Sequence, residues 1–80
     1  MAAEKLLERI SVDPNICGGK PCIRGHRIWV SLILGLLADG MSVEEILREY
    51  PGLEEADVRA CFAYGAKLAG GRFVDLSETT

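Results

Sequence analysis

The stretch "ADGMSVEEILREYPGL", residues 38–53, contains the boundaries of three helices. Gly40 is placed to end one helix, because glycine commonly follows the last helical residue. Ser42 can cap the next helix, and Glu45, three residues later, completes a capping box with it. Pro51 and Gly52 then end this short second helix before a third one begins. The stretch therefore predicts successive helices, the last two joined by a short turn as in a helix-turn-helix motif.

The helices on either side of this stretch have the apolar spacing of amphipathic helices. The pattern predicts a first helix over residues 30–39 and a third over about residues 54–69, ended by two glycines. The residues expected to face the core are Val30, Ile33, Leu34 and Leu37 in the first helix, Val43, Ile46, Leu47 and Tyr50 in the second, and Val58, Cys61, Phe62, Gly65 and Leu68 in the third.

Short β elements are expected before residue 30. Residues 10–13, "ISVD", alternate between apolar and polar side chains and stop at a proline, as a short strand does. Two β-capable runs flank Gly25 and His26, and this Gly-X pair predicts a tight hairpin. The expected fold class is mostly α, a three-helix bundle preceded by a short strand and a small β-hairpin. We expect one domain over residues 1–80: the β part at 10–29, the helical core at 30–69 and a flexible tail at 70–80.

The composition is that of a folded chain rather than a disordered one. Of the 80 residues, 49% are hydrophobic and 26% are charged. Neither a run long enough to cross a bilayer nor a secretory signal is recognisable in the sequence. We therefore expect a cytoplasmic protein, in which the three cysteines are reduced thiols rather than a disulfide framework.

The helix over residues 30–39 has more apolar surface than a small domain can cover. Trp29, Leu32 and Leu36 form a second apolar face beside the one that is expected to be buried. A domain of 80 residues has few elements with which to cover both faces. The sequence therefore predicts a homodimer with these three residues at its interface.

Charge is divided unevenly along the chain, whose net charge is −3. A basic segment holds Lys20, Arg24, His26 and Arg27, and residues 39–59 are acidic apart from two arginines. These four residues, which we call the basic hairpin, form together with Arg59 a candidate contact for nucleic acid or for an acidic partner. The alternative is a solvated strand edge whose charges prevent aggregation.

A helix-turn-helix motif places the start of its second helix against DNA. Here that position holds Glu54, Glu55 and Asp57, which phosphates would repel. A DNA-binding regulator is therefore the second choice, and it would have to use the basic hairpin.

The stretch "CGGKPC", residues 17–22, could be read as a metal or a redox site. Cys17, Cys22, His26 and Cys61 are ligands that zinc accepts, but only one end of the motif has paired cysteines. A disulfide between Cys17 and Cys22 would require close Cα atoms and an oxidising compartment. A backbone corner at the two glycines is the preferred interpretation. No pattern of catalytic residues is found, so we expect no enzyme activity and no cofactor.

Three segments of the chain resemble a small bacterial family, the domain of unknown function 433. They are "ISVDPNICGGKPCIRGHRI" (10–28), "LLADGMSVEEILREYPGL" (36–53) and "DVRACFAY" (57–64), and the similarity covers about residues 9–69. The resemblance implies a homeodomain-like helical fold that often dimerises, and an antitoxin-like partner of a PIN-like nuclease toxin. It carries no catalytic residues. Glu54 departs from the family pattern, which commonly has a Ser or Thr cap there, a better cap than glutamate.

The tail contains a short segment after two glycines in which three apolar side chains follow an arginine: Arg72, Phe73, Val74 and Leu76. It is a candidate toxin-binding tail that could dock as an extended segment, or it could fold back onto its own core. Together these features favour a non-enzymatic, dimeric antitoxin-like protein that neutralises a nuclease toxin.

Overall fold

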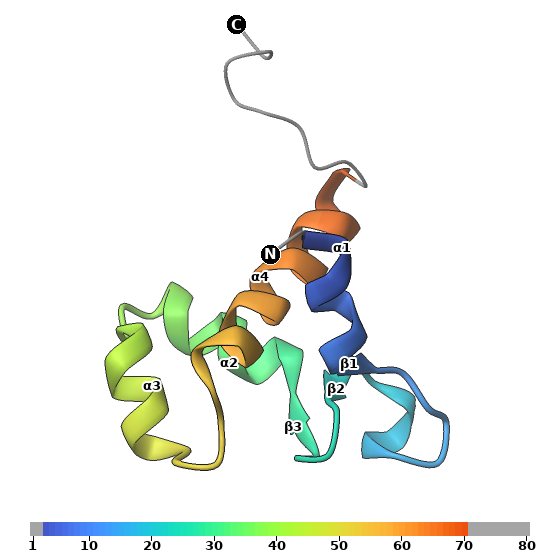
Figure 1. Ribbon diagram of the computed structural model, residues 1–80, viewed down its shortest axis with the longest axis horizontal. Coiled ribbons are helices and arrows are strands. Elements are labelled where there is room, and N and C mark those ends of the chain that lie inside the picture. Colours follow the sequence, from blue (N-terminus) through green and yellow to red (C-terminus); the bar gives the residue numbers. More distant parts are fainter. Residues whose placement is uncertain (1–2, 71–80) are drawn as a thin grey trace, which may run out of the picture.

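The computed structural model describes residues 3–70, which form a mostly helical fold with a small antiparallel sheet (Figure 1). This confirms the expected fold class at that level. The helices are α1 (Ala3–Leu6), α2 (Val30–Ala38), α3 (Val43–Glu49) and α4 (Glu55–Gly70), and the strands are β1 (Ile10–Ser11), β2 (Cys22–Ile23) and β3 (Ile28–Trp29). Short 3-10 turns lie at Leu7–Arg9 and Cys17–Gly19. None of the helices within residues 3–70 combines the length and apolar character needed to span a bilayer.

The three strands pair in the order β1-β2-β3, all antiparallel. Ile23 pairs with Ile10 on one side and with Ile28 on the other. The hairpin turn is therefore the four-residue loop 24–27, and the expected two-residue turn at Gly25 and His26 is wrong. Gly25 has the expected positive φ, but Arg27 also has one, of 54°. The loop needs two left-handed positions, and the sequence gives a glycine at only one of them.

The boundaries of α2 and α3 follow the sequence closely. Gly40, with φ of 102°, comes shortly after α2, and Ser42 begins α3 with the expected capping box. The Glu45 amide donates to Ser42 Oγ at 3.1 Å, and the Ser42 amide donates to Glu45 Oε1 at 2.9 Å. The hydrogen bond from the Ser42 backbone amide to the Glu45 carboxylate, and then the nearby Ser42 hydroxyl, lower the pKa of Glu45.

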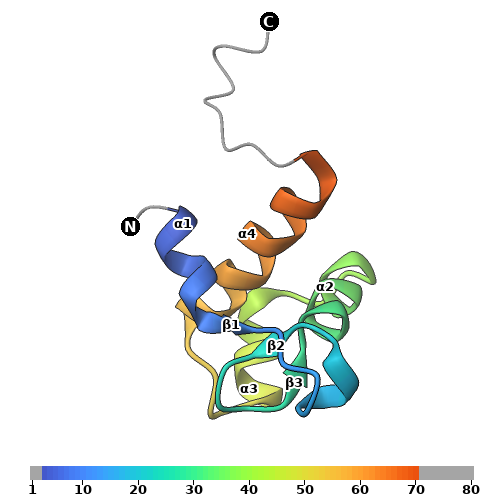
Figure 2. The ribbon, with the colours of Figure 1, turned by 90° about the vertical axis from the view of Figure 1, so that its right-hand side faces the viewer.

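The N-terminal helix α1 was not expected from the sequence. It lies beside α4 in both views (Figures 1 and 2) and contacts it. Leu6 of α1 and Ile10 of β1 are both buried and belong to the hydrophobic core. On α4, Ala60 and Ala63 are buried, and their small side chains permit close packing of a neighbouring segment.

The core lies where the sheet, α2, α3 and α4 meet. Its largest fully buried side chains are Ile23, Ile33, Ile46, Val58, Cys22 and Cys61. The expected inward positions of Phe62 and Leu68 are wrong, because these side chains are 49% and 71% exposed. A side-chain carbon at Gly65 would lie 3.2 Å from Leu34 Cδ1, so glycine allows α2 and α4 to approach closely.

Candidate functional site: an apolar patch beside a basic loop

Trp29, Leu32 and Leu36, which we call the apolar patch, remain accessible on the surface. Trp29 is 41% exposed, Leu32 is 42% exposed and Leu36 is half-buried. Trp29 immediately precedes α2, and the two leucines follow at intervals of three and four residues, so the three share one side of the helix. Residues 3–70 therefore leave uncovered most of the face that the sequence assigned to an interface.

Lys20 connects the basic segment to the apolar patch. Its Nζ lies 5.0 Å from the centroid of the Trp29 ring, within the range of a cation–π contact. This contact holds the ring and the ammonium group together at the edge of the sheet. The candidate basic contact and the candidate dimer interface are thus neighbours on the surface.

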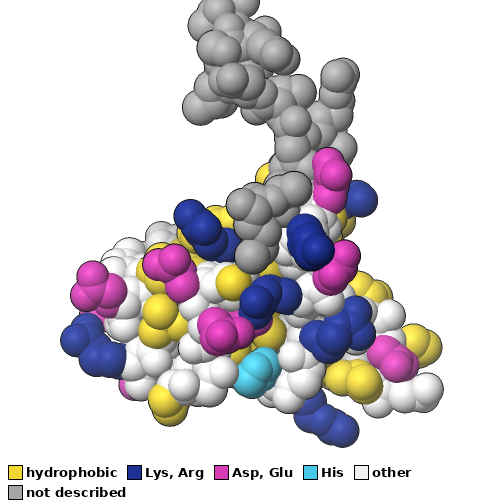
Figure 3. Space-filling model, in the orientation of Figure 1, with side chains coloured by type: hydrophobic (Ala, Val, Ile, Leu, Met, Phe, Trp, Pro, Cys, Tyr) yellow, Lys and Arg dark blue, Asp and Glu magenta, His cyan; other side chains and the backbone are white. Residues whose placement is uncertain are grey.

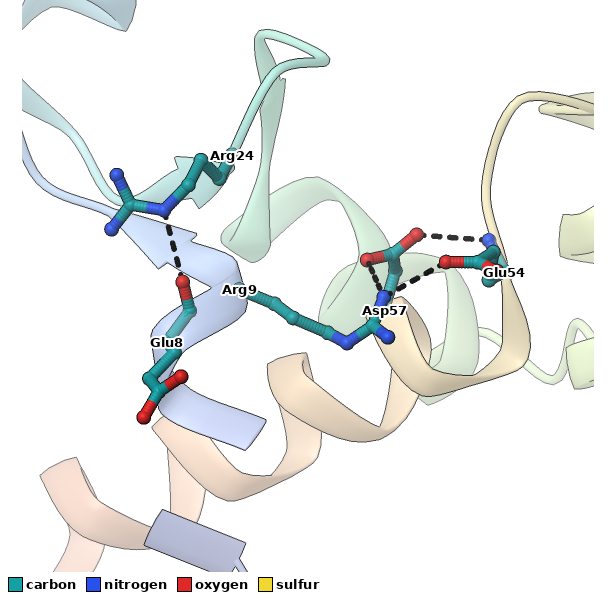
Figure 4. Close-up of polar contacts among 5 residues, drawn as sticks. All are labelled: Glu8, Arg9, Arg24, Glu54 and Asp57. Atoms are coloured by element: carbon teal, nitrogen blue, oxygen red, sulfur yellow. Dashed lines mark hydrogen bonds and ion pairs between the residues drawn. The ribbon is translucent and has the colours of Figure 1, made fainter. Parts of the chain in front are cut away.

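The Arg24 side chain forms hydrogen bonds within the domain that the sequence did not predict. Its Nε donates to the Glu8 carbonyl at 2.9 Å (Figure 4), and its Nη2 donates to the Ile10 carbonyl at 3.1 Å. Its backbone amide also donates to the Arg9 carbonyl, at 2.8 Å. The residue therefore fastens the hairpin loop to the segment that links α1 with β1.

The other candidate basic residues occupy different places. His26 is exposed in the hairpin loop, and a side-chain carbon at Gly52 would lie 3.5 Å from its Cε1, so the loop touches the α3–α4 connection. Arg27 is exposed and lines a pocket together with Arg24, whereas Arg59 is exposed on α4 and does not line that pocket. The structure thus brings two of the five basic residues to one pocket.

Arg9 forms an ion-pair cluster that sequence reasoning missed. Its Nη1 lies 3.0 Å from both Glu54 Oε1 and Asp57 Oδ1 (Figure 4). Asp57 is buried, and its Oδ2 accepts the Glu54 amide at 2.9 Å. The hydrogen bonds from Arg9 to Glu54 and then to Asp57 raise the pKa of Arg9. The sequence did contain a signal for this contact, because Asp57 lies three residues after Glu54, where an acid can accept the backbone amide at a helix start.

This cluster explains how α4 begins without a Ser or Thr cap. The Asp57 carboxylate satisfies the free amide at Glu54, and Arg9 neutralises the buried charge. Two of the three acids that oppose DNA binding at this helix start are therefore paired with Arg9. On the face drawn in Figure 3, acidic and basic side chains are interspersed and form no single basic surface.

All three cysteines carry free thiols: Cys22 and Cys61 are buried and Cys17 is half-buried. Within residues 3–70, no three His, Cys, Asp or Glu side chains lie close enough together to hold a metal ion. The zinc ligand set considered from the sequence is therefore not assembled. The glycine corner is confirmed, since Gly18 and Gly19 both have positive φ, and Cys17 before them does too.

The buried thiol of Cys61 makes the fold sensitive to alkaline conditions. Burial raises the pKa of Cys61 from the ordinary 9.0 to about 12. The unfolded chain then loses this proton at a lower pH than the fold, so the stabilisation is complete below pH 9 and falls as the pH rises toward 12. In denaturant titrations above pH 9, stability should fall more steeply in the wild type than in Cys61→Ala, by up to about 1.4 kcal/mol per pH unit. Parallel slopes for the two proteins would contradict this prediction.

Comparison with known proteins identifies the family but gives no activity. The chain is 36% identical over 75 residues to the uncharacterized protein y4eO of Sinorhizobium fredii (strain NBRC 101917 / NGR234). The alignment covers 89% of this chain and 34% of that protein, so the chain spans about a third of its relative's length. No solved structure matches the chain significantly. A family model described as "Protein of unknown function (DUF433)" matches residues 10–65, and the chain therefore belongs to the DUF433 family.

Proposed function

We propose that the chain is a non-enzymatic, antitoxin-like protein that acts in the cytoplasm as a homodimer and neutralises a PIN-like nuclease toxin. The observation that carries the proposal is the exposure of Trp29 and Leu32 on a domain of only 80 residues. Large apolar side chains that adjoin one another on a surface mark sites of protein association. We also propose that α2, α3 and α4 form a homeodomain-like unit, with α3 and α4 as its helix-turn-helix.

The acidic part of the chain suits a nuclease partner. Residues 39–59 contain seven acids and two arginines, and α3 exposes Glu44, Glu45 and Glu49. A nuclease that binds RNA presents a basic surface, which these carboxylates would complement. The nature of the toxin is inferred from the family resemblance. The candidate toxin-binding tail, Arg72, Phe73, Val74 and Leu76, lies outside the described residues.

The test is co-expression with a nuclease-like protein encoded beside the gene of this chain. We expect the two proteins to co-purify, and RNA cleavage by the toxin to fall when the chain is added in equimolar amount. Full RNA cleavage in the presence of a saturating amount of the chain would overturn the proposal. Truncation after Gly71 would then show whether the tail contributes to the affinity.

A DNA-binding regulator is the second candidate, because Lys20, His26 and Arg27 are exposed in or near one loop. Arg24 is less suited to this role, since its guanidinium already donates to two backbone carbonyls. A duplex titration at two salt concentrations separates the candidates. Binding that weakens steeply with salt would support DNA recognition, and absence of binding would reject it.

A further inference from the structure

A small pocket lies between the loop that follows β1 and the hairpin loop. It has a volume of about 230 Å³ and is lined in part by Ser11, Asp13, Cys22, Arg24, Gly25 and Arg27. Two guanidinium groups thus share the wall of one pocket with a single carboxylate. The pocket is formed by residues that neither the apolar patch nor the acidic helices use.

Arg24 is held in this wall before any ligand arrives. Its two hydrogen bonds to the Glu8 and Ile10 carbonyls fix the guanidinium plane, and part of the group remains available as a donor. A side chain that is already ordered loses little conformational entropy when it binds a ligand. Its charge is not neutralised by these bonds, because both acceptors are uncharged carbonyl oxygens.

Arg27 is held in the same wall by a backbone conformation that is unfavourable for a non-glycine residue. Its φ of 54° costs on the order of 1 kcal/mol relative to an ordinary conformation. Among the described residues, its guanidinium makes no hydrogen bond or ion pair. A strained position that carries an unpaired charge into a pocket is a feature that binding sites often show.

Both arginines act electrostatically on Cys22, a buried residue in the pocket wall. Cys22, which is only 2% exposed, has a pKa raised by burial and then by the neighbouring Cys17 thiol, whereas Arg27 and Arg24 act in the opposite direction. The two guanidinium groups therefore favour a negative charge at this point, although burial outweighs them at the thiol itself. Two arginines against one aspartate give the pocket wall a net positive charge, which favours an anionic group.

Asp13 in the pocket wall limits which kinds of anionic ligand can bind. Asp13 accepts the Asn15 amide at 2.8 Å through Oδ1, and its charge opposes a ligand that is negative along its whole length. A peptide can place one carboxylate between the arginines and present a backbone N–H to Asp13. A nucleic acid backbone, in contrast, would place a run of phosphates against Asp13 as well as against the arginines.

We propose that the pocket between the β1–β2 loop and the hairpin loop binds a carboxylate group of a partner polypeptide. Arg24 and Arg27 are the residues that bind this carboxylate. Arginine suits this role because its planar group binds a carboxylate through two parallel hydrogen bonds. The proposal rests on the pocket and is independent of the assignment of a nuclease toxin.

The experiment is an NMR titration of the full chain with three short peptides and with inorganic phosphate. The first peptide has Glu and Asp side chains and blocked ends, the second has Gln and Asn at those positions, and the third has neutral side chains with a free C-terminal carboxylate. We expect the amide signals of Cys22, Gly25 and Arg27 to shift with the first or third peptide and not with the second. The peptide that binds identifies the carboxylate as a side chain or a chain terminus.

Two variants make the titration specific. Arg27→Gly should reduce the affinity at least about tenfold and should fold as well as the wild type, because glycine adopts positive φ without strain. Arg48→Gln removes an exposed charge on α3 away from the pocket and should leave the affinity unchanged. The proposal would be overturned if Arg27→Gly bound the peptide as tightly as the wild type does. It would also be overturned if the second peptide, with Gln and Asn, bound equally well, or if phosphate shifted the signals and none of the peptides did.

Discussion

Replacing Asp57 with alanine is expected to lower the free energy of unfolding by about 2–3 kcal/mol, a large part of the stability of a domain this small. The variant loses the acceptor for the Glu54 amide at the start of α4 and the buried partner of Arg9. Both losses act at the junction of α4 with the segment that follows α1. Chemical denaturation of Asp57→Ala against the wild type measures the effect.

The matched control is Glu54→Ala. Glu54 contacts the same Nη1 of Arg9 at the same distance of 3.0 Å, but its side chain is 73% exposed, whereas that of Asp57 is 7% exposed. Water replaces most of what an exposed ion pair contributes, so Glu54→Ala should be much milder. If both variants lost the same stability, burial would not be the reason for the importance of Asp57.

Replacing Leu32 with glutamate is expected to abolish dimerisation at micromolar concentration, with a dissociation constant raised at least about 100-fold. The change places a charge in the middle of the apolar patch, between Trp29 and Leu36. A charge buried in an interface without a partner is unfavourable, and the same charge on a monomer surface is hydrated. Sedimentation equilibrium should therefore give the mass of one chain for the variant and of two chains for the wild type.

The control for this variant is Leu68→Glu. Leu68 is 71% exposed on α4 and does not belong to the apolar patch. We expect this protein to remain dimeric and both variants to keep the helical circular dichroism of the wild type. A wild type that sediments as a stable monomer at micromolar concentration, or a Leu32→Glu variant that remains dimeric, would overturn the proposed interface.

The helices after residue 30 could be predicted because their signals are local. Ser42 and Glu45 are three residues apart, and their side chains cap the helix that they begin. The apolar patch could also be expected, since it depends on a surplus of apolar residues in one short segment. Trp29 and Leu32 are accessible, and their place in a dimer interface stays a prediction.

The features that could not be predicted from the sequence depend on contacts between distant parts of the chain. Phe62 and Leu68 were expected in the core by helical spacing, yet α1 packs against α4, and the buried face includes Ala60 and Ala63. The partners in the Arg9–Asp57 pair are 48 positions apart, so no window of sequence contains both. The role of Arg24 was hidden for a similar reason, because its acceptors are backbone carbonyls, which every residue has.

The Arg9 cluster also determines where this chain can be shortened. The family match begins at Ile10, one residue after the guanidinium that neutralises Asp57 and four after the buried Leu6. An expression fragment trimmed to the matched limits would retain the acid and discard its counter-charge. Boundaries for recombinant work on this protein should therefore include α1, although the limits of the family match alone would suggest leaving it out.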